Sequence, residues 1–271
     1  MLESIKYATI SNIYVKDLIF FDEEKIDDLI VMCNNYGITY LPSRDRKSCY
    51  KLINGSFILS ELTENLICKP YDRIFDEKTL EKFEMGSHDE VMFVLDNEKI
   101  KGVVHIVDYN ADFINYEFFK ATFLFEKMLR KLLTRMNESN ETIIEWFKIK
   151  SVKSAHWKNR LEVCLPLDEK KLKEQILKRK ECNPFQTFYL NDLLSFAFSK
   201  KYVSQEFRNN RKAITEIRNW VSHSKDLTHK SKIESQPLYK LDGIKDFVSN
   251  ANIFFNCYEE LEELLLAKII K

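Results

Sequence analysis

Near the end of the chain, one hexapeptide contains the side chains needed to cleave RNA without a metal ion. It reads Arg218-Asn219-Trp220-Val221-Ser222-His223, or R-N-x-x-x-H. An arginine guanidinium is always charged and binds phosphate through a planar fork, so Arg218 can hold a scissile phosphate and stabilise the charge of the transition state. A histidine changes its charge near neutral pH, so His223 can transfer protons to or from a ribose 2′-hydroxyl or a leaving 5′-oxygen. Asn219 can orient either group.

On a regular helix these three side chains do not share one face. Asn219 and His223 are four residues apart and lie on the same side, whereas Arg218 lies about 140° around the axis from His223. Arg218 therefore needs its long side chain, or a helix end, to reach the same point as His223. Three fixed positions in six residues also arise by chance in helical proteins, so the alternative is a pair of ordinary surface residues.

The charge of the chain is divided between its two parts. The 271 residues include 42 Lys and Arg and 42 Asp and Glu, so the formal net charge is zero. Residues 1–110 hold 13 basic and 20 acidic side chains, whereas residues 111–271 hold 29 and 22. Within the second part, residues 148–232 hold 20 basic and 9 acidic side chains, so positive charge is concentrated around the hexapeptide. This distribution favours an anionic partner, and RNA fits the chemistry of the hexapeptide.

The second part of the chain also contains two groups of basic residues and three tryptophans, one of which lies within the hexapeptide. We expect the basic residues either to follow a phosphate backbone or to form solvated helix surfaces. The indole rings of Trp146, Trp157 and Trp220 can either stack on bases or pack in a helical core. The basic residues are Lys178, Arg179, Lys180, Arg208, Arg211 and Lys212.

The elements that must position these residues are helices. After Asn110 the apolar residues recur with the period of a helix, first at Phe118, Phe125, Leu129 and Met136. Residues 111–271 are therefore predicted to form an all-α domain. Further helical segments are predicted at about 141–157, 168–181, 190–200, 204–222 and 243–270, with breaks near Pro166, Pro184 and the polar stretch from Ser222 to Pro237.

The first 110 residues have a different pattern, in which short helices alternate with short strands. A helix is predicted from Phe21 to Cys33 and a strand from Gly37 to Pro42. The order recurs with a helix from Asp76 to Phe83, a strand from Val91 to Leu95, and a second strand from Ile100 to Val107 after a turn. The expected fold class is thus α+β, with one domain at 1–110 and a second at 111–271.

The second part of the chain resembles the HEPN (higher eukaryotes and prokaryotes nucleotide-binding) superfamily. The resemblance rests on the R-N-x-x-x-H hexapeptide and on the helical segment Phe125-Glu126-Lys127-Met128-Leu129-Arg130-Lys131-Leu132-Leu133. It implies a helical bundle, often a homodimer, whose two motifs face each other and form one metal-independent endoribonuclease site. Arg218 and His223 would then be the catalytic pair, Asn219 their polar companion, and Glu126 a supporting residue on the first long helix.

Residues 1–110 resemble a pair of cystathionine-β-synthase (CBS) domains, and the best match runs from Val91 to Asp108. In such domains a Ser/Thr-x-x-Asp segment after the last strand contacts a nucleotide. The matching residues are His105 and Asp108, and His105 departs from the hydroxyl residue of the pattern. The first copy has no Asp near Cys49 to Asn54. The pair is therefore either a structural element or a sensor of an adenosine nucleotide as regulatory ligand.

Several other classes of protein do not fit the sequence. The six cysteines form no C-x-x-C pair, no secretory signal opens the chain, and no apolar run approaches the roughly 20 residues that span a bilayer. We therefore expect a cytoplasmic protein with reduced thiols and no membrane contact. No metal-ligand spacing and no glycine-rich phosphate loop occurs, so neither a bound metal nor another cofactor is expected.

The leading hypothesis is an endoribonuclease of HEPN type, regulated by a CBS-like domain. By the same resemblance it would be a toxin or an effector of abortive infection against phage, with RNA as substrate and an antitoxin or defence-system protein as partner. The alternative is a catalytically silent module that binds a nucleotide or dimerises in such a system.

Overall fold

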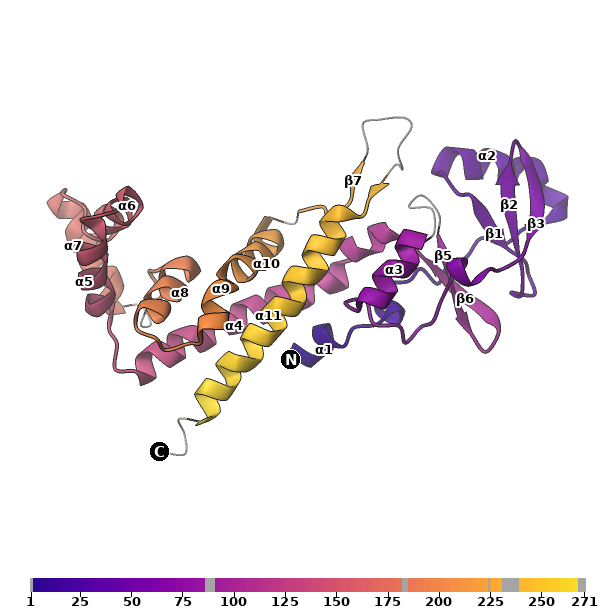
Figure 1. Cartoon of the computed structure of the whole chain (residues 1–271). Coiled ribbons are helices and arrows are strands. Elements are labelled where there is room, and N and C mark those ends of the chain that lie inside the picture. Colours follow the sequence, from indigo (N-terminus) through magenta and orange to yellow (C-terminus); the bar gives the residue numbers. More distant parts are fainter. Residues whose placement is uncertain (1, 86–90, 182–184, 224, 231–238, 268–271) are drawn as a thin grey trace. The chain divides into compact units, whose positions relative to one another are not determined.

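The computed structural model describes residues 2–85, 91–181, 185–223, 225–230 and 239–267. It is an α+β structure, as the sequence predicts, in which two small three-stranded sheets precede a helical region (Figure 1). None of the described helices combines the length and the apolar character that a membrane-spanning helix needs.

The first sheet is an antiparallel meander of β1 (Tyr40–Pro42), β2 (Cys49–Ile53) and β3 (Ser56–Ser60). The helix α2 (Ile26–Tyr36) precedes it and ends at Gly37, whose φ of 66° favours glycine. Asn54 and Gly55 connect β2 to β3 with φ values of 50° and 76°, which is the conformation that a tight two-residue hairpin turn requires. The predicted helix is present but begins at Ile26 rather than Phe21 and ends at Tyr36 rather than Cys33. The predicted strand begins at Tyr40 rather than Gly37, and β2 and β3 follow β1 without an intervening helix.

The second sheet contains a crossover. The strand β4 (Ile67–Cys68) leads into α3 (Glu77–Met85), and the chain returns as β5 (Met92–Asp96) parallel to β4, then as β6 (Lys99–Val104) antiparallel to β5. The predicted helix, strand and turn are present here. The last strand ends at Val104 rather than Val107, because residues 106–110 form a 3₁₀ helix. The first sheet is entirely antiparallel, whereas the second contains a parallel pair. The resemblance of this region to a CBS pair stays a prediction.

Most of the predicted helices after residue 110 are present, and two of the predicted segments are each divided into two helices. The segment predicted at 204–222 is divided at Asn210 into helices at Gln205–Asn209 and Arg211–His223. The segment predicted at 141–157 is two helices, because the chain turns at residues 152–154 and Ser154, a favoured N-cap residue type, precedes α6. Residues 231–238 and 268–271, which include part of the predicted break and the end of the last helix, lie outside the described residues. The described helices after residue 110 are α4 (Asp112–Arg135), α5 (Asn140–Ser151), α6 (Ala155–Cys164), α7 (Glu169–Glu181), α8 (Leu190–Ser199), α9 (Gln205–Asn209), α10 (Arg211–His223) and α11 (Asp242–Ala267). Two short paired strands, β7 (His229–Lys230) and β8 (Tyr239–Lys240), precede α11. A further helix, α1 (Leu2–Lys6), lies near the start of the chain.

The chain forms two compact units that do not coincide with the two predicted domains. One unit comprises Met1–Phe119 and Trp220–Asn252, and the other comprises Lys120–Asn219 and Ile253–Lys271. Each unit therefore contains part of α4, α10 and α11.

The first unit has an aromatic core. Phe118 of α4 lies 5.7 Å from Phe75 and 5.3 Å from Phe247 of α11, measured between ring centroids. Trp220 of α10 lies 4.4 Å from Phe247 in the same way. The hydroxyl of Tyr109, which is buried, donates to the carbonyl of Ile74 at 2.7 Å. The ring contacts of Trp220 with Phe118 and Phe247 anchor this end of α10 to α4 and α11 within the unit.

The second unit is built around Phe125 of α4. Its ring centroid lies 5.3 Å from that of Phe254 and 5.9 Å from that of Phe207. A buried ion pair adds a polar contact between α6 and α8, in which Nε of Arg160 donates to the two carboxylate oxygens of Asp192 at 3.1 and 3.2 Å. The side chains of this pair are only 10% and 2% exposed, so each charge depends on the other.

We expect Asp192→Ala to destabilise the protein strongly, because it leaves the guanidinium of Arg160 buried without its counter-charge. The free energy of unfolding should fall by about 3–5 kcal/mol. Urea unfolding followed by circular dichroism measures this change.

The matched control is Glu145→Ala, which removes a carboxylate from an exposed ion pair with Lys148, whose side chains are 64% and 48% exposed. Exposed pairs of this kind contribute about 0.5 kcal/mol or less. A loss at Asp192 no larger than the loss at Glu145 would contradict this account of the α6–α8 contact.

Candidate functional site

The hexapeptide lies on α10, and this helix has one apolar and one polar side. The apolar side chains are buried, while Arg218 and His223 are exposed and Asn219 is half-buried. Burial of one side determines the orientation of the other, so the two candidate catalytic residues must face outward. The buried residues are Ala213, Ile214, Ile217, Trp220 and Val221.

The geometry of α10 separates Arg218 from His223. Five residues of a regular helix place the two Cα atoms about 7.5 Å apart along the axis and about 140° apart around it. Neither side chain forms a hydrogen bond or an ion pair with another residue in the described ranges, so both are available to a ligand. A regular helix therefore does not bring the guanidinium of Arg218 and the imidazole of His223 to a common point.

Glu126, the predicted supporting residue, has its ionic partner on its own helix. Its carboxylate lies 3.4 Å from the guanidinium of Arg130, one turn further along α4. Within the described part of the chain this is a local helix pair, of the kind that contributes a few tenths of a kcal/mol. The structure does not bring Glu126 to the hexapeptide through any described contact.

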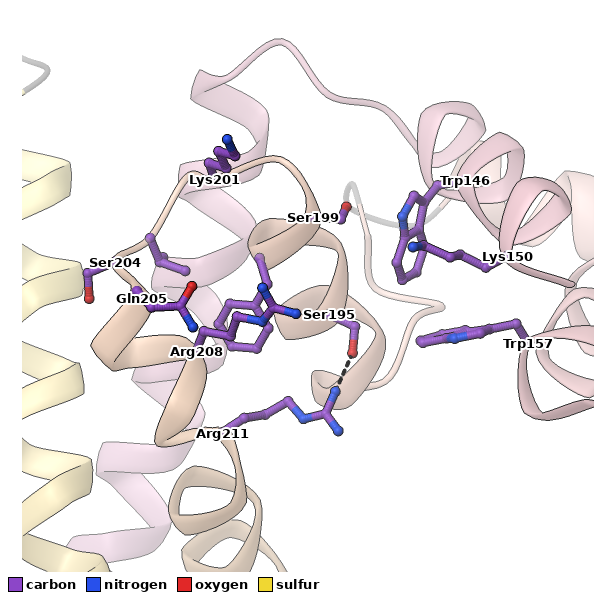
Figure 2. A pocket seen from close by; sticks show the side chains of 12 residues that line it. Trp146, Lys150, Trp157, Ser195, Ser199, Lys201, Ser204, Gln205, Arg208 and Arg211 are labelled. Carbon is purple, nitrogen blue, oxygen red and sulfur yellow. Dashed lines mark hydrogen bonds between the residues drawn. The ribbon is translucent and has the colours of Figure 1, made fainter. Parts of the chain in front are cut away.

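Two of the predicted RNA-binding residues line one cavity of about 520 Å³ in the second unit (Figure 2). Arg208 of α9 and Arg211 of α10 face it, together with the indole rings of Trp146 from α5 and Trp157 from α6. The guanidinium of Arg211 donates to the hydroxyl of Ser195 at 2.9 Å, which holds it at the cavity wall. We call this space the α8–α9 cavity, because its remaining lining comes mainly from α8 and the segment that leads into α9.

The other predicted RNA-binding residues are not part of this cavity. Lys178 and Lys180 are exposed on α7, and the guanidinium of Arg179 donates to the carbonyl of Cys164 at 2.8 Å, which ties α7 to the end of α6. Lys212 is exposed on α10 and does not line the cavity. The structure thus brings Arg208 and Arg211 together and leaves the α7 group apart as a helix surface.

The predicted nucleotide contacts, His105 and Asp108, cap the 3₁₀ helix at residues 106–110. Oδ2 of Asp108 accepts the backbone N–H of His105 at 2.8 Å, and Nδ1 of His105 accepts the backbone N–H of Val107 at 3.2 Å. A hydrogen-bonding residue followed three positions later by an acid is the signature of a capping box, and it coincides with the nucleotide-binding pattern in sequence. Burial raises the pKa of Asp108 to about 6, although the bond from His105 opposes this.

Several residues that line the α8–α9 cavity were not predicted from the sequence. Lys150 and Lys201 add two more cations, and Ser195 orients Arg211. These residues come from α5, from α8 and from the segment between α8 and α9, and they become neighbours only through packing. The sequence indicates only that Trp146 and Lys150 are neighbours, because residues four apart lie on one face of a helix.

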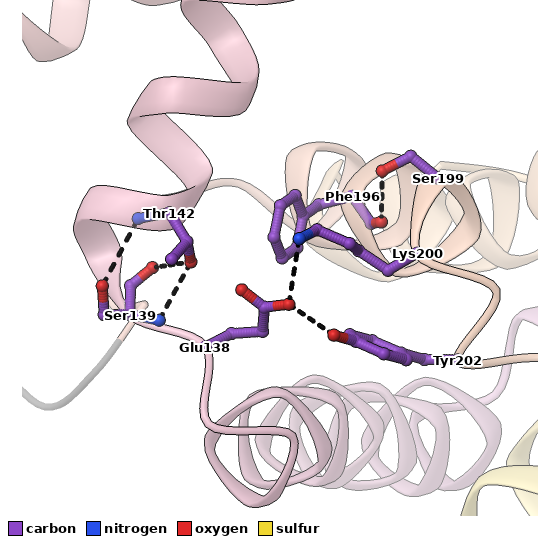
Figure 3. A network of polar contacts seen from close by, with 7 residues as sticks. All are labelled: Glu138, Ser139, Thr142, Phe196, Ser199, Lys200 and Tyr202. Atoms are coloured by element: carbon purple, nitrogen blue, oxygen red, sulfur yellow. Dashed lines mark hydrogen bonds and ion pairs between the residues drawn. The ribbon is translucent and has the colours of Figure 1, made fainter.

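A polar network holds the segment that leads from α8 to α9. Figure 3 shows the carboxylate of Glu138 between the ammonium of Lys200, at 3.3 Å, and the hydroxyl of Tyr202, which donates to it. Burial, and then the hydrogen bond to Glu138, raise the pKa of Tyr202 to about 12. Lys201, which lines the cavity, lies between these two anchored residues.

Comparison of the chain with protein-family models, with curated proteins and with solved structures found no match.

Stability should depend on pH through Asp108. Because its folded-state pKa of about 6 lies above the unfolded value of 3.8, the folded protein binds the proton more tightly, and the free energy of unfolding falls as pH rises from about 4 to 6. Asp108→Asn keeps an oxygen acceptor for the N–H of His105 and removes the buried charge. We expect this variant to be more stable than the wild type by about 1–3 kcal/mol at pH 7.5, with the difference disappearing near pH 4.

Urea unfolding of both proteins between pH 4 and pH 7.5 measures this difference. A difference that stays constant over that range would show that Asp108 does not titrate as a buried carboxylate.

Proposed function

We propose that this protein is a metal-independent endoribonuclease of HEPN type, in which two copies of the chain bring their α10 helices together around one RNA phosphate. The observation that carries the proposal is the outward placement of Arg218 and His223 on one regular helix. The resemblance of the hexapeptide to the HEPN motif supplies the reaction, and the excess of positive charge at 148–232 supports an RNA substrate.

In the proposed reaction His223 removes the proton of the ribose 2′-hydroxyl, and the resulting oxygen attacks the adjacent phosphorus. Arg218 binds the phosphate oxygens and stabilises the additional negative charge of the transition state. Asn219, half-buried beside them, orients the hydroxyl or the phosphate. The bond to the 5′-oxygen breaks, that oxygen takes up a proton, and a 2′,3′-cyclic phosphate remains, so the reaction needs no metal ion.

A dimer resolves the separation of Arg218 and His223 along α10. The two groups of one chain point about 140° apart, but two facing helices can place an arginine and a histidine from different copies on one phosphate. An exposed aromatic stripe on α4 supports self-association, because apolar surface of this kind favours burial in an interface. It consists of Tyr116, Phe119 and Phe123, which are 63%, 58% and 61% exposed and lie on one side of the helix.

The same proposal assigns a regulatory role to residues 1–110 and a cytoplasmic location to the protein. It includes action as a toxin or as an effector of phage defence, held inactive by an antitoxin or a defence-system partner. The alternative, a silent module that binds a nucleotide through His105 and Asp108, has less support, because both residues are engaged in capping the 3₁₀ helix.

We expect His223→Ala and Arg218→Ala each to lower the rate of RNA cleavage in EDTA by at least about 100-fold, because a proton-transfer group contributes roughly 10²–10⁴-fold. The assay follows a labelled RNA incubated with full-length protein. Ser222→Ala is the matched control, because Ser222 is exposed beside His223 and has no role in the proposed chemistry. Equal activity of His223→Ala and the control would refute the assignment of the motif, and absence of activity in the wild-type protein would favour the silent module.

We expect Phe123→Asp to shift the protein from dimer to monomer, because a charge in an apolar interface is not solvated. Sedimentation velocity measures the mass. The control Val163→Asp introduces the same charge at a residue that is 53% exposed on α6 and lies outside the stripe. The dimer face would be wrong if both variants sedimented like the wild type.

A further inference from the structure

The α8–α9 cavity has one aromatic wall. The ring centroids of Trp146 and Trp157 are 4.7 Å apart with an interplanar angle of 68°, and Trp157 stacks on Phe147 at 5.5 Å. Trp157 is only half-buried, so part of its ring faces the cavity (Figure 2). The indole N–H of Trp146 is buried and has no acceptor among the described residues. The exposed part of an indole ring can stack with a nucleobase, and such stacking contributes about 1–3 kcal/mol per base.

The cavity is also cationic. Lys150, Lys201, Arg208 and Arg211 line it, and its described lining includes no carboxylate. Lys150 lies on the aromatic wall, with its ammonium 5.9 Å from the ring centroid of Trp146, whereas Lys201, Arg208 and Arg211 lie on the other side (Figure 2). Glu260 contacts one lining residue, because its carboxylate accepts the N–H and the hydroxyl of Ser204 at 2.9 and 2.8 Å. Four like charges around one space repel one another unless an anion lies between them. Arginine at such a position favours phosphate, whose oxygens match the guanidinium fork.

We propose that the α8–α9 cavity is a nucleotide-binding site, in which the base packs on Trp157 and Trp146 and the phosphate binds Arg208 and Arg211. The volume of about 520 Å³ is within the range of roughly 300–1,000 Å³ that small-ligand sites occupy. A simple anion would leave the tryptophans without a role, and an apolar ligand would leave the cations without one. A nucleotide uses both walls.

The site is held in shape before any ligand arrives. Arg160 lies three residues after Trp157 on α6, and its ion pair with Asp192 fixes that helix on α8. The hydroxyl of Ser195 positions Arg211, and the Glu138 network holds the residues on both sides of Lys201. A site that is already ordered loses less entropy on binding than one that must form around its ligand.

The nucleotide has two sources that share this chemistry, a free nucleotide and one unit of a single-stranded RNA. Arg211 and Arg218 are seven residues apart on α10, which places them on the same side of the helix and about 10 Å apart along it. A strand bound in the cavity would therefore run close to Arg218. Binding at the cavity does not require the proposed cleavage reaction, because none of its lining residues belongs to the hexapeptide.

Isothermal titration of the full-length protein tests the proposal with three probes. These are ATP, a single-stranded oligonucleotide with 2′-O-methyl groups, which cannot be cleaved by 2′-hydroxyl attack, and tripolyphosphate, which carries charge without a base. We expect ATP, the oligonucleotide or both to bind, and tripolyphosphate to bind at least tenfold more weakly than the better of the two. Binding of ATP identifies a free nucleotide as a ligand, and binding of the oligonucleotide alone identifies RNA.

Variants link the binding to the cavity. Arg208→Gln should weaken it by roughly 10- to 100-fold, as expected for loss of a charge-assisted hydrogen bond. Lys158→Gln is the control, because it also removes one positive charge from an exposed residue, next to Trp157 but outside the cavity lining. Trp157→Leu should weaken binding of the base-containing probes and leave that of tripolyphosphate unchanged, and its thermal unfolding confirms that it is folded.

The proposal is overturned if neither ATP nor the oligonucleotide binds, if tripolyphosphate binds as tightly as they do, or if Arg208→Gln and Lys158→Gln behave alike. The same titration of His223→Ala separates this inference from the proposed function. Unchanged binding in that variant supports the cavity as an independent site, and loss of binding would place the nucleotide at the hexapeptide instead.

Discussion

The burial of one side of α10 is the constraint on which the candidate chemistry depends. Ile214, Ile217 and Trp220 are 0%, 1% and 5% exposed, so rotation of the helix about its axis would expose apolar surface to water. Burial of a large apolar side chain contributes about 1.5–3 kcal/mol, and three such residues fix the orientation firmly. Arg211, Arg218 and His223 are therefore held on the exposed side of α10.

The same helix connects two different kinds of site. At its beginning, Arg211 closes a cavity whose other walls come from α5, α6, α8 and α9. At its end, Arg218 and His223 are exposed, and in the proposed function they form a catalytic site with a second copy of the helix. The lining of the cavity comes from one chain and is held by the Arg160–Asp192 pair and the Glu138 network, whereas the proposed catalytic site requires self-association. Binding and cleavage can thus be tested separately.

The sequence predicted the features that depend on local periodicity. The apolar period after Asn110 predicted the long helix that begins at Asp112, and the strands around the turn at residues 96–99 were predicted for the same reason. The turn at residues 152–154 was missed, because α5 and α6 continue one helical pattern and reverse only through tertiary packing of Trp157 on Trp146. The capping role of Asp108 was missed because one sequence pattern serves both capping and nucleotide binding. The cavity was beyond prediction because its walls meet only in the folded chain.

In the proposed reaction, a 2′-hydroxyl of RNA attacks the adjacent phosphorus, with His223 and Arg218 in place of a metal ion. Analysis of the new RNA ends after incubation of the full-length protein with a defined RNA in EDTA tests it most directly. The account predicts a 2′,3′-cyclic phosphate or a 3′-phosphate on one fragment and a 5′-hydroxyl on the other. Fragments with a 3′-hydroxyl and a 5′-phosphate, formed only when a divalent cation is added, would contradict it.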